Sequence, residues 1–488
     1  MTFVSQLQPK EIWQHFDNIL TIPRGSKNEQ AMREYVIAMA QKHGLTYKQD
    51  DVGNLMVIKP ATPGHEAAPI TILQCHLDMV CEKNTDVKHD FTKDAIKPRQ
   101  EGDYLYATGT TLGSDNGVGV AASLAVLESR SIKHGPLELL FTVDEETGLT
   151  GAANLQPDFL KGRRLINLDT EEEGSLYVGC AGGAGVNLKL NVQYKKAPAD
   201  SVGYEIRLHG LRGGHSGVDI HLQRGNAIKL LARLLTSVSR KTAVHLASIT
   251  GGNMHNAIPR EAFAQVAVAV SDAKAFEKAL HDQFDAVFNE FKLADPEMKL
   301  SLSKNNDPAQ VLDDSSAQKV LHLLNALPHG VVSMSYDIPG LVETSSNLAT
   351  INIKDSEMVL HVSNRSSVAS ALRATQERVT SIGWLAGAQS EELEGYPGWK
   401  PNLNSHVLKV AQEVHKAALG KEPKIKAIHA GLECGIIGEK FSRMDMVSLG
   451  PQIEFPHSPN ERVRIGSVAD FYKLLIGILE RLAKDKSN

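Results

Sequence analysis

Three short apolar stretches of this sequence each end in imidazole or carboxylate side chains. The endings are His76 with Asp78, Glu145 with Glu146, and Asp169. Short apolar and β-branched runs are typical of strands that are buried on both faces, and helical periodicity lies between them. The sequence therefore predicts an α/β fold with a mixed, mostly parallel sheet flanked by helices. Because ligands and reacting groups lie just past the carboxyl ends of strands in such sheets, we expect a functional site there.

The chain of 488 residues is too long for one compact core, so we expect more than one domain. From about residue 187 the pattern changes to half-exposed, alternating strands with intervening helices, and the α/β pattern returns after residue 394. We therefore predict a catalytic domain formed by residues 1–186 and 395–488. An inserted α+β lid domain would span residues 187–394.

The bulk composition excludes several classes of protein. A formal charge of −5, from 52 basic and 57 acidic residues, gives no electrostatic reason to expect binding to nucleic acid or to a membrane surface. Four scattered cysteines are too few for a disulfide framework. The sequence shows no signal peptide and no apolar stretch of about 18 residues, so we expect a cytoplasmic protein without a transmembrane helix.

The start of an early helix can also be predicted. Ser26 and Glu29 have the spacing of a capping box, in which each side chain bonds to the backbone N–H of the other residue. Apolar residues follow at helical spacing, and Gly44 supplies a stop signal. We therefore expect a helix that begins at this box and ends at Gly44.

Five side chains from separate loops form a candidate metal-binding set. They are His76, Asp115, Glu146, Asp169 and His457. Imidazole and carboxylate ligands without thiolates suit Zn²⁺, and Co²⁺ or Mn²⁺ also fit such a set. If Asp115 is shared, the set can hold two metal ions about 3.5–4 Å apart. One ion would take His76 and Asp169, and the other would take Glu146 and His457. Such a pair polarises a carbonyl and lowers the pKa of a bridging water.

Two further carboxylates flank these ligands. Asp78 lies two residues after His76, so both side chains point to the same side of an extended backbone. The Asp78 carboxylate can then accept the free ring N–H of a metal-bound histidine. Glu145, next to Glu146, is the candidate general base: it would take a proton from the water and later deliver it to the leaving amine.

Four of the five candidate ligands also have an ordinary structural explanation when each is taken alone. Asp115 precedes an apolar helix and could be its N-cap. Glu146 could belong to a solvated turn, His457 could be a surface histidine in a proline-rich loop, and His76 could simply end a strand. If none of the five candidates bound a metal, their placement in loops of this kind would require five unrelated coincidences. The sequence therefore favours the metal site.

Motifs along the chain resemble those of the zinc metallopeptidase family that includes carnosinase, aminoacylase and related exopeptidases. In chain order they are QCHLDMV, GTTLGSDNGVG, DEETGLTGA, INLDTEEEG, GLRGGHSG, HAGLECG and GPQIEFPHSPNERV. They span nearly the whole chain, and NAIPREAFA and YPGW point to the bacterial dipeptidases of this family. The resemblance implies a homodimer whose subunits each hold two Zn²⁺ ions, with a catalytic α/β domain interrupted by an α+β lid.

The resemblance also assigns roles to residues that are already candidates. The five candidate ligands match the metal ligands of the family. Asp78 matches the carboxylate that orients a histidine ligand, and Glu145 matches the general base. The bond between Asp115 and Asn116 is expected, from the resemblance, to be a cis peptide.

Four further residues match substrate-binding positions of the family. His215 resembles the histidine that stabilises the tetrahedral oxyanion, which in several relatives comes from the partner subunit. Asn256 and Arg365 resemble residues that hold the C-terminal carboxylate of the substrate, and an Arg fork suits a carboxylate. Gly431 resembles the residue whose backbone helps to position the substrate. Without the resemblance, His215 is equally well explained as a turn residue and Arg365 as a surface cation.

The implied function is hydrolysis of unblocked dipeptides, including Xaa-His dipeptides such as β-alanyl-histidine. Two alternatives stay open at this stage. An N-acyl amino acid hydrolase of the same family would prefer a blocked amine, so a free dipeptide and its N-acetyl form distinguish the two activities. A catalytically silent binding or scaffold protein on the same fold is disfavoured by the intact ligand set and by Glu145.

Overall fold

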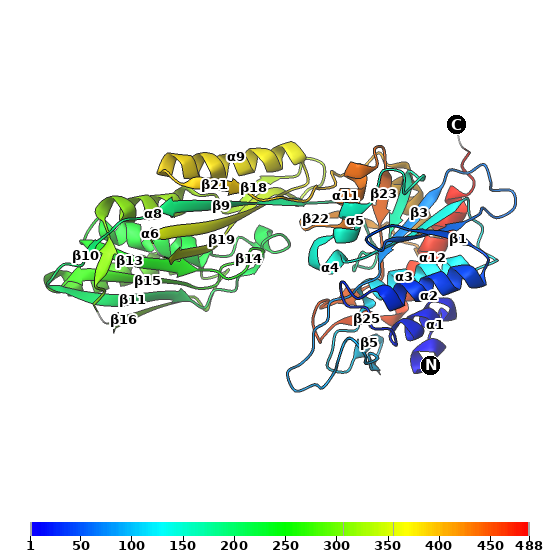
Figure 1. The fold of residues 1–488 in the computed structure, drawn as a ribbon, viewed down its shortest axis with the longest axis horizontal. Coiled ribbons are helices and arrows are strands. Elements are labelled where there is room, and N and C mark those ends of the chain that lie inside the picture. The colour runs from blue at the N-terminus through cyan, green and yellow to red at the C-terminus, as the bar shows by residue number, and fades with distance from the viewer. Residues whose placement is uncertain (1, 306, 355, 487–488) are drawn as a thin grey trace. The chain divides into compact units, whose positions relative to one another are not determined.

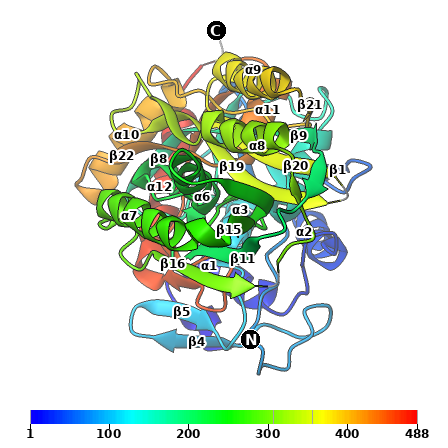
Figure 2. The same cartoon turned by 90° about the vertical axis from the view of Figure 1, so that its left-hand side faces the viewer.

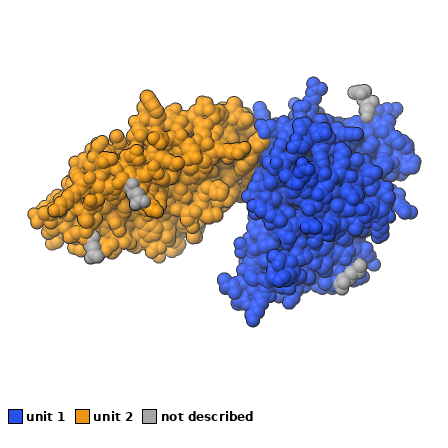
Figure 3. Space-filling model, in the orientation of Figure 1, with its two compact units in different colours: residues 1–180, 399–427, 432–488 blue, residues 181–398, 428–431 orange. Residues whose placement is uncertain are grey.

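The chain folds into two compact units, which are coloured separately in Figure 3. Unit 1 comprises Met1–Cys180, Trp399–Ala427 and Leu432–Asn488, and unit 2 comprises Ala181–Gly398 and Ile428–Gly431. The computed structural model describes residues 2–305, 307–354 and 356–486. The sequence places the domain boundaries after residues 186 and 394, and these boundaries stay a prediction.

Unit 1 is built on a mixed sheet with the strand order β1-β2-β6-β3-β7-β23-β8-β22 (Figure 1). These strands are β1 (Thr46–Gln49), β2 (Leu55–Lys59), β3 (Thr71–His76), β6 (Leu137–Thr142), β7 (Arg164–Asn167), β8 (Ser175–Cys180), β22 (Lys424–Ile428) and β23 (Asp445–Ser448). The central strands β6, β3, β7 and β23 run parallel, whereas β1 and β2 pair antiparallel at one edge. Strands β3 and β6 are buried along their whole length, as the apolar runs predicted. The predicted fold class is confirmed.

Helices enclose this sheet. They are α1 (Lys10–Ile19), α2 (Gln30–Lys42), α3 (Ser114–Glu128), α4 (Glu145–Gly148), α5 (Thr150–Asn154), α10 (His406–Leu419), α11 (Glu433–Lys440) and α12 (Ile465–Leu482), with a short 3-10 helix η1 (Phe3–Gln6). Helix α3 packs against both α1 and β3, and its side chains are buried on every face from Asn116 to Leu127. A helix that is apolar all round belongs inside a core, so α3 fixes the loop before it firmly against the sheet.

The predicted capping box of α2 is wrong. The helix begins at Gln30 and has Glu29 as its N-cap, without a side-chain cap hydrogen bond. The Ser26 hydroxyl donates instead to Asp78 Oδ2 at 2.8 Å, and Glu29 Oε1 accepts the backbone N–H of Asp144 at 3.0 Å. Both side chains therefore bond to residues that closely follow strands β3 and β6. The predicted stop at Gly44, which has a φ of +68°, is confirmed.

A small antiparallel sheet also belongs to unit 1. Its strand order is β24-β25-β5-β4, with β4 (Pro98–Glu101), β5 (Tyr104–Ala107), β24 (Ile453–Glu454) and β25 (Arg462–Arg464). The loop between β24 and β25 carries His457, so a segment near the C-terminus is anchored beside strands from the first part of the chain.

Unit 2 contains an antiparallel sheet with the order β16-β11-β15-β13-β19-β20-β9-β21, and β18 pairs with β19 (Figures 1 and 2). Its strands are β9 (Gly182–Asn191), β11 (Ser201–His209), β13 (Val244–Gly251), β15 (Ala262–Ala269), β16 (Lys299–Asn305), β18 (Gly330–Met334), β19 (Val342–Lys354), β20 (Glu357–Ser366) and β21 (Gln389–Glu392). Helices α6 (Ala227–Ser239), α7 (Ala273–Phe291), α8 (Asp314–Ala326) and α9 (Ala369–Ala386) share one hydrophobic core with it. This is the α+β architecture expected of the inserted domain.

Short elements complete unit 2. They are β10 (Tyr194–Lys196) with β17 (Gln310–Leu312), β12 (Gly214–His215) with β14 (Ala257–Ile258), and the 3-10 helices η2 (Ile220–Leu222) and η3 (Val270–Asp272). Among the described residues, no helix combines the length and the apolar composition needed to cross a bilayer. All four cysteines are free thiols.

Candidate metal centre

The five candidate ligands all lie in unit 1, close to the carboxyl ends of its parallel strands. His76 is the last residue of β3, Glu146 follows β6 in α4, and Asp169 lies two residues beyond β7. Asp115 is near the start of α3, and His457 lies in the loop between β24 and β25. Strand ends at one edge of a parallel sheet bring distant segments together, which is why these residues can meet.

The side chains converge into two groups that share Asp115. His76 Nε2 lies 3.1 Å from Asp115 Oδ1 and 3.2 Å from Asp169 Oδ1. His457 Nε2 lies 3.1 Å from Asp115 Oδ2 and 3.1 Å from Glu146 Oε2. Within each group the candidate ligand atoms lie within 4.8 Å of one another. Asp115 therefore offers one oxygen to each group, which is the sharing expected from the sequence.

The electrostatics of the cluster suit divalent cations. It gathers three carboxylates and two imidazoles, and Glu146 Oε1 is buried without a hydrogen-bond partner. Burial, followed by the charge of Asp115, raises the pKa of Glu146 to about 6. Hydrogen bonds to Asp115 and Glu146 raise the pKa of His457 to about 11. Crowded, buried carboxylates require a positive charge nearby, and nitrogen and oxygen donors of this kind fit Zn²⁺.

Asp78 connects a candidate ligand to the loop that carries Glu145 and Glu146. Its Oδ1 lies 3.3 Å from His76 Nδ1 and accepts the backbone N–H of Glu145 at 3.1 Å. Its Oδ2 accepts the backbone N–H of Glu146 at 3.1 Å. Burial alone would raise the pKa of Asp78, but the hydrogen bond from His76 and that residue's charge hold it at about 2. The charged carboxylate thus favours the proton on Nδ1 and leaves Nε2 of His76 available to a metal.

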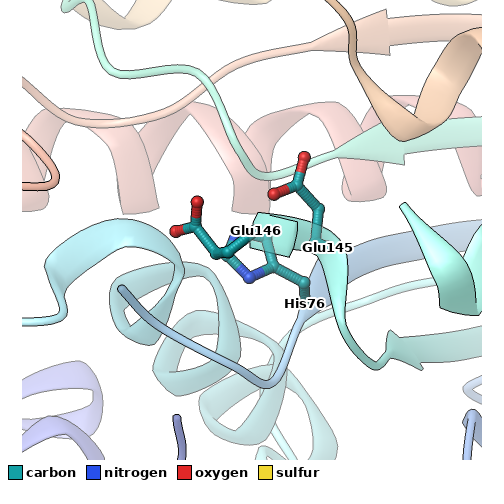
Figure 4. A group of neighbouring side chains, drawn as sticks. All are labelled: His76, Glu145 and Glu146. Carbon is teal, nitrogen blue, oxygen red and sulfur yellow. The ribbon is translucent and has the colours of Figure 1, made fainter. Parts of the chain in front are cut away.

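Glu145 differs from its neighbour in its surroundings. Figure 4 shows the carboxylates of Glu145 and Glu146 leaving consecutive positions in different directions near the His76 ring. Among the described residues, the Glu145 carboxylate has no hydrogen bond or ion pair. Burial, with the charges of Asp169 and Glu146, raises the pKa of Glu145 well above its usual range. A carboxylate with a raised pKa and no partner is suited to accept and release a proton.

The bond between Asp115 and Asn116 is a cis peptide, as the resemblance led us to expect. Asp115 has non-helical angles, with φ −83° and ψ 111°, and the N-cap of α3 is Gly113. The alternative that Asp115 caps this helix is therefore wrong, and its carboxylate faces the two histidines instead. Asn116 Nδ2 donates to Leu168 O at 2.8 Å and to Asp169 Oδ1, so the same turn also holds Asp169.

Two buried charged residues that hold these loops were not predicted from the sequence. Arg24 Nη1 donates to Leu77 O at 3.0 Å and to Asp78 O at 2.6 Å, and its Nη2 donates to Gly113 O. Glu461 accepts backbone N–H groups from residues 112–114 at 2.7–3.0 Å. The only sequence signal for Glu461 is its position four residues after His457. Arg24 lacks even that signal.

The four candidate substrate-binding residues all belong to unit 2. His215 pairs with Ala257 across the β12–β14 ladder, and the backbone N–H of Ser216 donates to Asn256 O at 2.8 Å. His215 and Asn256 are therefore neighbours. Gly431 lies against the ring of Tyr396, because a Cβ at Gly431 would lie 2.8 Å from Cε2 of that ring.

The tautomer of His215 follows from its backbone contacts. Its Nδ1 faces the N–H groups of Gly217 at 3.2 Å and Val218 at 3.0 Å, so Nδ1 must be an acceptor. Burial, and then the charge of Arg365, lowers the pKa of His215 to about 4. Near neutral pH the ring is therefore uncharged and its proton is on Nε2, which makes Nε2 a hydrogen-bond donor.

Arg365 is a buried cation that lacks an acidic partner. Arg365 is only 7% exposed, and no described Asp or Glu forms a salt bridge with it. Its Nη2 lies 3.5 Å from His215 Nε2, its Nη1 donates to Tyr396 Oη at 2.8 Å, and its Nε has no hydrogen-bond partner. A buried guanidinium without a carboxylate has unused donors for an anion.

Comparison with known proteins gives one family match and strong similarities. A family model described as "Peptidase family M20/M25/M40" matches residues 72–483. The chain is 42% identical over 485 residues to the cytosol non-specific dipeptidase of Escherichia coli K12, covering 99% of each chain. It superposes with a TM-score of 0.92 and 40% identity on the crystal structure of aminoacylhistidine dipeptidase from Vibrio alginolyticus, covering 100% of this chain and 99% of that one. Human carnosine dipeptidase 1, at 12% identity and a TM-score of 0.51 over 97% of each chain, shares the fold.

Proposed function

This chain belongs to the peptidase family M20/M25/M40, and from that membership we propose that it is a metallodipeptidase that hydrolyses unblocked dipeptides. The observation that carries the proposal is the pair of ligand groups in unit 1 that share Asp115. Two cations bound in these groups would polarise the scissile carbonyl and lower the pKa of a water molecule between them. Zn²⁺ suits the nitrogen and oxygen donors, and Co²⁺ or Mn²⁺ could substitute.

Glu145 is proposed as the general base. Its carboxylate is free of hydrogen bonds among the described residues, so nothing in the fold competes for the proton that it receives. It would take a proton from the attacking water and deliver the proton to the nitrogen of the leaving amine. The Asp78 carboxylate accepts the Glu145 backbone N–H, which holds the base in register with His76.

The groups in unit 2 are proposed to bind the substrate. His215, with its proton on Nε2, would donate to the oxygen of the tetrahedral intermediate. Arg365, which has no acidic partner in the described chain, would take the C-terminal carboxylate together with Asn256. The backbone at Gly431 would help to position the substrate.

The substrate class follows the relatives. The Vibrio alginolyticus structure is named for aminoacylhistidine, so we propose that Xaa-His dipeptides, including β-alanyl-histidine, are among the substrates. The Escherichia coli relative is named as a cytosol dipeptidase, and we propose a cytoplasmic location here as well. The family resemblance supports a homodimer, which sedimentation would test.

One set of measurements tests the function. Purified protein is analysed for bound metal and assayed on free dipeptides and on their N-acetyl forms, with and without a chelator. We expect about two metal ions per chain, chelator-sensitive hydrolysis, and a strong preference for the free amine. Glu145→Gln should retain the metal and lose about 10²–10⁴-fold in turnover, because the amide cannot accept the proton. Wild-type turnover by this variant would remove Glu145 from the base role, and a preference for N-acetyl substrates would favour an acylase.

A further inference from the structure

Tyr396 is held tightly in unit 2, next to two of the candidate substrate-binding residues. Its backbone forms a bridge with Gly183, in which Gly183 N donates to Tyr396 O at 3.0 Å and Tyr396 N donates to Gly183 O at 2.9 Å. A Cβ at Gly183 would lie 2.8 Å from ring atom Cζ, and a Cβ at Gly431 would lie 2.8 Å from Cε2. Two glycines therefore leave the space that the ring fills.

In the hydrogen bond between Arg365 and Tyr396, the arginine is the donor, so the Tyr396 hydroxyl remains free to donate its own hydrogen. Arg365 Nη1 lies 2.8 Å from Tyr396 Oη, and a guanidinium has donors only. The oxygen of Tyr396 must accept in this bond, so its own hydrogen points elsewhere. Among the described residues, no acceptor for that hydrogen is found.

Several donors on Arg365 and Tyr396 thus lack an acceptor among the described residues. They are the Tyr396 hydroxyl and Nε and Nη2 of Arg365. Arg365 is buried and Tyr396 is half-buried, so donors left unpaired here would be costly. A carboxylate has two oxygens that accept about four hydrogen bonds, and it matches this set in charge and in number.

We propose that the Tyr396 hydroxyl donates a hydrogen bond directly to the C-terminal carboxylate of the substrate, beside Arg365. Tyr396 thereby contributes to the preference for a free carboxylate over an amide. A C-terminal amide would lack the negative charge and would turn an NH₂ group toward one of the donors. This inference rests on the proposed dipeptidase function, since it concerns the recognition of that substrate.

The test compares wild type with Tyr396→Phe, which keeps the ring between the two glycines and removes only the hydroxyl. For each protein, kcat/KM is measured on a free dipeptide and on its C-terminally amidated form. We expect the preference for the free form to fall about tenfold, through a higher KM for the free dipeptide. Both dipeptides are assayed with the same preparation of each protein. A smaller folded fraction therefore lowers both values of kcat/KM equally and leaves their ratio unchanged. An unchanged ratio overturns the proposal.

A matched control and a double variant separate direct contact from support of Arg365. Tyr336→Phe removes a hydroxyl from a tyrosine of the same unit that is 96% exposed, and it should leave the ratio unchanged. In an Arg365→Ala background, Tyr396→Phe should still weaken inhibition by a free amino acid product about threefold or more. No further loss in that background means that Tyr396 acts only through Arg365, which overturns direct contact. Failure of the dipeptidase function itself would show separately, as absence of turnover by wild type.

Discussion

Glu461 is expected to hold the turn that presents Asp115, and Glu461→Gln tests this. The carboxylate is 2% exposed and accepts from one turn through both oxygens. Its Oε2 accepts the N–H groups of Leu112 at 2.8 Å and Gly113 at 3.0 Å. Its Oε1 accepts the N–H of Ser114 at 2.7 Å and the Ser114 hydroxyl at 2.5 Å. Glutamine has the same shape but only one accepting oxygen in its amide.

The magnitude follows from the donors that lose their acceptor. If the amide oxygen of glutamine stays beside Ser114, its NH₂ faces the N–H groups of Leu112 and Gly113. Each buried N–H left unpaired costs about 1–3 kcal/mol, so we expect the turn to be destabilised by about 3 kcal/mol. At about 1.4 kcal/mol per factor of ten, this raises the open population of residues 112–114 by about 10²-fold. Since Asp115 directly follows, metal affinity should fall by about 10–100-fold, as for other groups that support ligands.

Hydrogen–deuterium exchange of the peptide that contains residues 112–115, combined with metal titration, measures both effects. Glu454→Gln is the matched control, because Glu454 also lies in unit 1 but forms a partly exposed pair with Arg462. Such pairs contribute at most about 1 kcal/mol, so the control should exchange and bind metal nearly as wild type does. If Glu461→Gln leaves both exchange and metal affinity unchanged, the carboxylate does not hold this turn.

Two further predictions concern unit 2. Arg365→Ala should lower kcat/KM for free dipeptides by about 10²-fold, because a charge-assisted contact with the carboxylate is lost. The kcat/KM for C-terminally amidated dipeptides should change far less. Equal losses for both substrates would argue against carboxylate binding. His215 should titrate near pH 4 with its Nδ1 unprotonated above that pH, as measured by NMR of ¹³C-labelled histidine. Because the unfolded chain takes up this proton first, near the ordinary pKa of 6.5, the contribution of His215 to stability should be lost as pH falls from about 6.5 to about 4. Titration near pH 6.5 would contradict the lowered pKa, and a neutral ring protonated on Nδ1 would contradict the tautomer.

The fold and the convergence of the candidate ligands were predictable from the sequence for a physical reason. Strands β3, β6 and β7 are short apolar runs, and parallel strands in one sheet place their following residues at a common edge. A residue that ends such a run, such as His76, or follows it closely, such as Asp169, is therefore located by local pattern alone. Membership of the peptidase family was predicted correctly for a different reason, which is the resemblance of motifs along the chain.

Residues that support the site were not predictable in this way. Arg24 and Glu461 contact the same turn from segments about 90 and 350 residues away in the chain. Nothing in their local sequence marks a buried charge, since their partners are backbone groups of any residue type. Ser26 shows the opposite failure, because its local pattern predicted a capping box while its hydroxyl binds Asp78. Local patterns specify which elements form, whereas side-chain-to-backbone contacts between distant loops depend on the finished fold.

The charges of the candidate sites in the two units support the proposal of a substrate with a free carboxylate. The cluster in unit 1 holds more carboxylates than imidazoles and requires cations, which in turn attract a carbonyl oxygen. The cluster in unit 2 holds an unpaired Arg365 and a neutral His215, and it requires an anion. A dipeptide carries both a scissile carbonyl and a free carboxylate, so it supplies a group for each of the two clusters. A substrate whose carboxylate is replaced by an amide would leave the charge of Arg365 buried and uncompensated.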